Sequence, residues 1–187
     1  MKATALVLGI HVAFAASLLA GAARADFSAG VVGGYGLPRQ ADGDDVWRWG
    51  YGARAGYTFL LPVYIGVAST FHAGSADDEA GAPRQTVSYH GLEGGLDLTL
   101  ASLGLRPYVS AGLADLTTTR DVKGGFLSPF VAIGVMPSLR VVDLPGLDLY
   151  LGLDARYVRL LRLVDNGDNS HPESALPVYV TALLRAF

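Results

Sequence analysis

The chain of 187 residues contains no cysteine, and only 17% of its residues are charged. The lack of cysteine excludes a disulfide scaffold and every metal site that needs thiolate ligands. The formal net charge is −3, and the sequence shows neither a basic cluster nor a phosphate-binding glycine loop. These absences argue against nucleic-acid binding. The 24 glycines follow no three-residue period, which excludes a collagen-like chain. We therefore expect no metal and no cofactor.

The N-terminus carries the longest apolar run of the sequence. Lys2 is followed by the apolar residues 3–22 and then by Ala23-Arg24-Ala25. A charged start, an apolar middle and a small-x-small end are typical of a secretory signal peptide. We expect cleavage after Ala25, which leaves 26–187 as one domain. An uncleaved membrane anchor is the alternative, because the run is almost long enough to span a bilayer. No later run reaches the roughly 20 residues of a transmembrane helix.

Beyond residue 25 the sequence divides into segments of alternating character, separated by stretches rich in turn-forming residues. The connections after the first, third, fifth and seventh segments are long and polar, whereas the other three are short. In an up-and-down sheet, alternate connections lie at the same end. All the long loops then emerge at one end, and both termini lie at the other. We expect eight β-strands, over 26–36, 46–59, 63–73, 85–100, 104–116, 125–139, 147–160 and 176–187.

The segment Val46–Phe59 shows how the two faces of a strand differ. Successive side chains point to opposite faces, so Arg48 and Arg54 share one face with glycines, and the aromatic residues share the other with alanines. The same contrast recurs in 147–160, where leucines oppose charged residues. Aromatic rings concentrate at water–lipid boundaries. We therefore expect the apolar face to contact lipid, with these residues at the interface: Trp47, Trp49, Tyr57 and Phe59.

These patterns predict an all-β fold, an eight-stranded antiparallel up-and-down transmembrane β-barrel. In a bilayer every backbone polar group must be paired within the protein, so strands must close into a barrel. Eight strands give an interior that side chains can fill. A soluble barrel with its apolar face inside is the alternative. It leaves the glycine-rich faces and the arginines in water, and it does not account for the unequal loops. The faces of the first and last strands stay open.

Several charged residues point into the predicted lumen. Isolated buried charges are costly unless they are paired. We hypothesise that the charges form a salt-bridged plug; the alternatives are charges wetted by lumenal water, and a narrow pore. Arg185 joins the group if it faces inward. Those expected near mid-height are Arg54, Glu93, Asp154 and Arg156, and those expected near the short-turn end are Asp97, Arg106 and Asp148.

The chain ends YVTALLRAF, with Phe187 last. Together with the signal peptide, the eight spans and the unequal loops, this end resembles the small OmpA-like and OmpX-like outer-membrane barrels. In that family the terminal aromatic residue is read by the barrel-assembly machinery. Arg185 departs from the pattern, which has an apolar or aromatic residue two before the last. The resemblance implies a monomer in the bacterial outer membrane, surrounded by its lipid and by lipopolysaccharide.

The resemblance also admits enzymes that modify lipid A, either acyl hydrolases or acyltransferases. The His-x-Ser pair of barrel-type deacylases is absent. His90 and Ser88 share a strand face and are weak catalytic candidates, whereas Glu93 points to the opposite face. Two long loops are rich in acidic residues, as is typical of solvated loops: Asp42, Asp44, Asp45, Asp77, Asp78 and Glu79. A minor alternative is that they bind divalent cations that bridge to lipopolysaccharide phosphates. We expect a structural or surface-interaction protein with long extracellular loops and no catalytic site.

Overall fold

The computed structural model describes residues 25–38, 47–59, 62–73, 85–118, 126–161 and 174–187. The expected signal peptide and the acidic loop residues lie outside these ranges. In the part described, no helix is long and apolar enough to cross a membrane. The strands are β1 (Asp26–Pro38), β2 (Trp49–Thr58), β3 (Val63–Ala73), β4 (Gln85–Leu96), β5 (Leu98–Leu100), β6 (Leu103–Thr118), β7 (Phe126–Leu144), β8 (Leu147–Leu160) and β9 (Ser174–Ala186).

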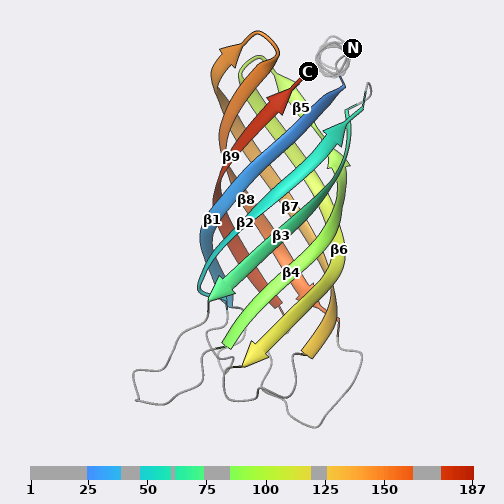
Figure 1. Ribbon diagram of the computed structural model, residues 1–187, viewed down its shortest axis with the longest axis vertical. Helices are drawn as coiled ribbons and strands as arrows, with labels where there is room; N and C mark the ends of the chain where they lie inside the picture. The colour runs from blue at the N-terminus through green and yellow to red at the C-terminus, as the bar shows by residue number, and fades with distance from the viewer. Residues whose placement is uncertain (1–24, 39–46, 60–61, 74–84, 119–125, 162–173) are drawn as a thin grey trace, which may run out of the picture.

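All strands belong to one closed antiparallel sheet (Figure 1). Neighbours in the chain pair with each other, β1 pairs with β9, and β4 pairs with β6 to complete the circle. The short strand β5 pairs with β6 in the register that β4 began, because only Asp97 interrupts the ladder. β4 and β5 are therefore one wall segment in two parts. The predicted eight-stranded up-and-down barrel is confirmed.

The two ends of the barrel differ. Asp26 and Phe187 lie at the end where two-residue turns join β5 to β6 and β7 to β8, at the top of Figure 1. We call this the turn end and the opposite one the loop end. In the turn Pro145-Gly146 the glycine has a φ of 79°, which suits the second central position of a type II turn after proline. The expectation that both termini lie at the short-turn end is confirmed.

β7 is longer than the sequence pattern predicts. The expected strand ended at residue 139, with a connection from Arg140 to Gly146, but pairing with β8 continues to Leu144. A register shift between Arg140 and Val142 makes this possible. A bulge inserts one residue and lets the ladder continue beyond it. The prediction of a seven-residue connection was therefore wrong, and the connection is a tight turn.

Buried and exposed positions largely alternate along the strands, and the exposed side is the apolar one. In β3, Val63, Ile65 and Val67 are exposed, whereas Tyr64 and His72 are buried. This arrangement contradicts the soluble alternative, in which the apolar side chains would lie inside. It also shows which side chains of the first and last strands, β1 and β9, face outward, a point that the sequence pattern left open. Outside are Phe27, Val31, Val180 and Leu184, and inside are Ser28, Val32, Tyr179, Leu183 and Arg185.

Tyrosine rings fill the interior by lying over glycines. The ring of Tyr64 covers Gly56 and Gly66, and a Cβ atom added at Gly66 would clash with the Tyr64 hydroxyl oxygen. Gly94 lies on the outward face, where an added Cβ meets nothing within 4 Å. The two glycines thus differ in how closely another group approaches them. The first is needed for the position of a buried ring, and the second is not.

We predict that Gly66→Ala lowers the free energy of unfolding by about 1–3 kcal/mol, because the added methyl group overpacks the lumen against Tyr64. The matched control Gly94→Ala should stay within about 0.5 kcal/mol of the parent, since its methyl group enters open space. Urea unfolding of the detergent-folded protein, followed by tryptophan fluorescence, measures both. Equal effects of the two substitutions would contradict the proposed packing.

Candidate functional site

Two arginines and two carboxylates form a buried layer inside the barrel. Arg54 of β2 lies 2.7 Å from Glu93 of β4 and 3.4 Å from Asp154 of β8, each measured between a guanidinium nitrogen and a carboxylate oxygen. Arg156 is paired with Asp154 as well. The hydroxyl of Tyr108 donates a hydrogen bond of 2.6 Å to Asp154. These four ionised groups balance in charge, and all are nearly inaccessible to solvent.

A second charged layer lies nearer the turn end and is centred on Asp97. Its carboxylate lies 2.5 Å from Arg106 and 2.5 Å from Arg185, and it accepts a hydrogen bond of 3.0 Å from Thr58. The guanidinium carbon of Arg106 lies 3.8 Å from the centre of the Tyr64 ring, a cation–π contact. Arg185, left open by the sequence pattern, is therefore an inward partner of Asp97.

Asp148 forms its ion pair with an arginine outside the layer centred on Asp97. Its carboxylate lies 3.3 Å from Arg140, which also contacts Asp143 at 3.3 Å. Arg140 is partly exposed, and sequence reasoning placed it in a connection. The bulge that lengthens β7 begins at this arginine. A pattern search extended through the bulge could have found Arg140, because an arginine there continues the inward series of Ser138.

The loop end of the lumen is filled mainly by apolar and aromatic side chains. Trp47 is fully buried and packs against His72 and Tyr89, with ring centres 5.3 and 6.0 Å apart. His72 Nε2 lies 2.6 Å from the hydroxyl of Tyr179, which lies 2.6 Å from that of Tyr89. The buried apolar members of this cluster are Trp47, Val87, Tyr89, Ala114, Phe130, Ala132, Val158 and Ala175.

The placement of Trp47 corrects the sequence prediction, which put this residue at the lipid interface. β2 begins only at Trp49, so the two-residue alternation does not extend to Trp47. The chain turns inward there, and the Gly36 amide donates a hydrogen bond of 3.0 Å to the Arg48 carbonyl. Trp49, by contrast, is 70% exposed. Tyr57 and Phe59 are also exposed on the outer face, near the turn end.

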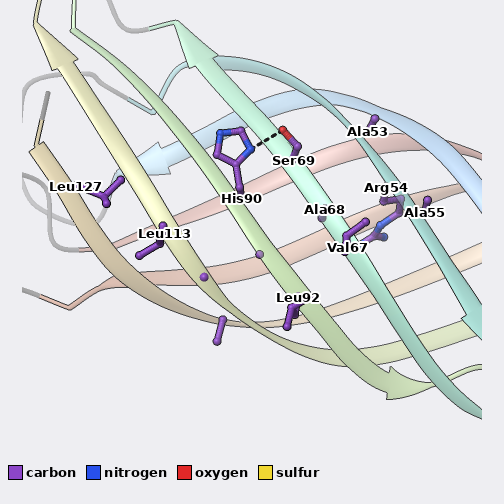
Figure 2. A pocket seen from close by; sticks show the side chains of 13 residues that line it. Ala53, Arg54, Ala55, Val67, Ala68, Ser69, His90, Leu92, Leu113 and Leu127 are labelled. Atoms are coloured by element: carbon purple, nitrogen blue, oxygen red, sulfur yellow. Dashed lines mark hydrogen bonds between the residues drawn. The ribbon is translucent and has the colours of Figure 1, made fainter.

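The outward face holds a polar pair that joins two strands. Ser69 Oγ of β3 lies 2.8 Å from His90 Nδ1 of β4, and both side chains are exposed (Figure 2). The two residues are directly opposite each other in the β3–β4 register. The sequence candidate Ser88 lies on the same outward face, two residues along β4, whereas Glu93 points inward to Arg54. His90 thus pairs with a serine that sequence reasoning did not select.

Removing one partner from the middle layer should be costly. We predict that Glu93→Gln lowers the free energy of unfolding by about 3–5 kcal/mol, because it leaves two buried arginines, Arg54 and Arg156, against the single carboxylate of Asp154. The control Asp143→Asn removes an ion pair whose side chains are 29% and 66% exposed, so its cost should be at most about 1 kcal/mol. Urea unfolding in the same detergent measures both variants. A small effect of Glu93→Gln would show that water or rearrangement compensates Arg54.

The comparisons with known proteins agree with this geometry. A family model described as "Outer membrane protein beta-barrel domain" matches residues 4–171. Neisserial surface protein A shares the fold, with a TM-score of 0.56 and 15% identity over 87% of this chain and 96% of that chain. A major outer membrane protein from Thermus thermophilus has a TM-score of 0.56 and 14% identity over 87% of this chain and 99% of that one. No protein with a curated description matches the sequence. The chain belongs to the outer membrane protein β-barrel domain family.

Proposed function

We propose that this outer-membrane barrel is a non-conducting structural or surface-interaction protein, with a lumen plugged by charge and with its long loops displayed outside the cell. The observation that carries the proposal is the pairing of buried charges across the lumen. Arg54 and Asp97 each contact two oppositely charged side chains. An interior of eight strands is just wide enough for side chains to fill.

Side chains fill the lumen at three successive levels along the barrel axis. The apolar cluster with Trp47 and Phe130 lies toward the loop end, the layer with Arg54 occupies the middle, and the layer with Asp97 lies toward the turn end. An ion crossing the barrel would have to disrupt each level in turn. This succession supports a closed lumen over the alternative of a narrow pore.

If the lumen is closed, the function of the protein depends on its outer surface and its loops. The strand ends that lead into the four long connections are gathered at one end of the barrel. In outer-membrane barrels the longer loops are extracellular, which supports a role in contacting partners at the cell surface. We propose that a signal peptide of residues 1–25 directs export and that the monomeric barrel is surrounded by outer-membrane lipid and lipopolysaccharide.

Purified protein reconstituted into planar lipid bilayers should give no steady single-channel current, because the paired charges and aromatic rings fill the lumen. A conducting porin inserted under the same conditions serves as the positive control. Reproducible conductance steps from the folded protein would contradict the closed lumen and favour the pore.

The proposal also includes assembly through the C-terminal strand β9 and Phe187. Removal of Phe187 should slow insertion by the barrel-assembly machinery in reconstituted vesicles, since the terminal aromatic is the expected recognition element. Spontaneous refolding in detergent is the control and should be unchanged. Equal rates of machinery-assisted insertion with and without Phe187 would contradict this role.

A further inference from the structure

One patch of the outward face departs from the apolar pattern of the barrel wall. β3 presents Val63, Ile65, Val67 and Phe71 to the outside, and Ser69 interrupts this series. Polar side chains that face hydrocarbon are costly and often functional. On one side of Ser69, β4 presents the polar side chains of Thr86, Ser88 and His90 to the outside, and Asp115 of β6 lies opposite Ser88. On the other side, the residue of β2 opposite Ser69 is Ala53.

The strand register defines which residues lie next to His90. Ser69 lies on one side of His90 across the β3–β4 pairing. On the other side, His90 is opposite Leu113, and Asp115 is the next outward residue of β6 toward the loop end. Ser69 Oγ lies 2.8 Å from His90 Nδ1. In the tautomer that carries its proton on Nε2, His90 Nδ1 accepts this hydrogen bond, and Ser69 then has a base in position to take its proton.

The pair lies at the edge of an open groove in the outer wall. The groove has a volume of about 760 Å³, within the range of small-molecule sites. Its lining includes the small residues Ala53, Gly91 and Ala111 and three leucines, Leu92, Leu113 and Leu127; the leucines are labelled in Figure 2. This recess suits an apolar chain that lies along the barrel wall. Ser69 and His90 then meet any polar group that such a chain carries.

The depth of the pair matches the region where lipid acyl chains join their polar groups. Tyr51 and Phe71 are opposite each other on the outer wall, with ring centres 5.4 Å apart. Aromatic residues of this kind mark the membrane interface. Ser69 is the next outward residue of β3 from Phe71 toward the turn end, on the hydrocarbon side. An acyl chain in the groove would therefore bring its carboxyl end close to the serine.

A second groove shows that the recess alone does not define the site. It has a volume of about 730 Å³ and lies over Gly94, Val109 and Ala155, on the outer wall nearer the turn end. None of its lining residues is a serine, threonine, histidine or acid. In both places, small side chains leave a recess in the outer surface of the barrel. The hydrogen-bonded serine and histidine distinguish the first groove.

We propose that Ser69 and His90 form a lipid-facing nucleophile–base pair that cleaves acyl esters of outer-membrane lipids. Ser69 Oγ attacks the ester carbonyl carbon while His90 Nδ1 takes the hydroxyl proton. The bond to the alcohol then breaks, and His90 returns the proton to that alcohol, leaving an acyl-serine. Water, deprotonated by His90, then attacks the carbonyl carbon of the acyl-serine. The bond from that carbon to Ser69 Oγ breaks, His90 returns the proton to Oγ, and a fatty acid is released. This activity goes beyond the proposed surface role and does not depend on a closed lumen.

The test uses the folded protein in two kinds of vesicle, one of phosphatidylethanolamine alone and one of phosphatidylethanolamine with lipopolysaccharide. Mass spectrometry measures fatty acid release. Ser69→Ala and His90→Gln should reduce the release at least about 100-fold, the usual range for loss of acid–base catalysis. The control Ser102→Ala changes an exposed serine of the β5–β6 turn, at the opposite end of the barrel, and should retain the parent rate within about twofold. The vesicles that yield fatty acid, and the chain lengths released, identify the source lipid.

Each result has a definite meaning. Release that depends on Ser69 and His90 but not on Ser102 supports the proposal. No release from either vesicle above a protein-free blank overturns it, and so does a parent-like rate for Ser69→Ala. Circular dichroism shows whether each variant keeps its strands; Ser69→Ala should, because it places a methyl group against lipid. A second measurement is covalent labelling by an alkyl fluorophosphonate, which should add to the parent and to Ser102→Ala but not to Ser69→Ala.

Discussion

Hydrocarbon on the outside confines most ionised side chains of these strands to the narrow interior, where each charge needs an opposite charge within reach. Arg54 meets this need by bridging β4 and β8, and Asp97 by joining arginines of β6 and β9. Such pairs offset the cost of desolvation only with good geometry and further hydrogen bonds. The two pairs of Arg54 and the Asp97–Arg185 pair link strands that are not neighbours in the sheet, so they hold separate walls of the barrel at fixed separations. Arg106, by contrast, lies on β6, which pairs directly with β4 and β5 on either side of Asp97.

Tyrosine and glycine make this arrangement possible in so small a lumen. The rings of Tyr64 and Tyr108 lie over glycines of adjacent strands, where a Cβ atom would meet them at less than 3 Å. The same rings contact guanidinium groups, with Arg106 lying 3.8 Å from the centre of Tyr64. The Tyr108 hydroxyl in turn donates to Asp154. A glycine in the strand, a tyrosine ring packed on it and a buried ion pair in contact with the tyrosine therefore form one packing unit.

The two-residue alternation of the sequence predicts the barrel, the strand positions and the facing of most side chains. It failed at Trp47, because the alternation holds only inside a strand and β2 begins two residues later. It also ended β7 too early, since a bulge breaks the pattern at Arg140 without ending the ladder. The sequence could not identify the partner of His90. Alternation gives the face of a residue but not its register across a long loop, so Ser88 was chosen and Ser69 was not.

The burial of Trp47 has a consequence for following the protein spectroscopically. The chain has two tryptophans; one is enclosed at the loop end of the lumen, and the other, Trp49, projects from the outer wall. They stand two residues apart yet sample two separate environments. Their emission therefore reports on distinct events, with one indole sensing closure of the interior and the other sensing contact with surrounding acyl chains. Quenchers confined to the membrane would distinguish insertion from the final locking of the interior.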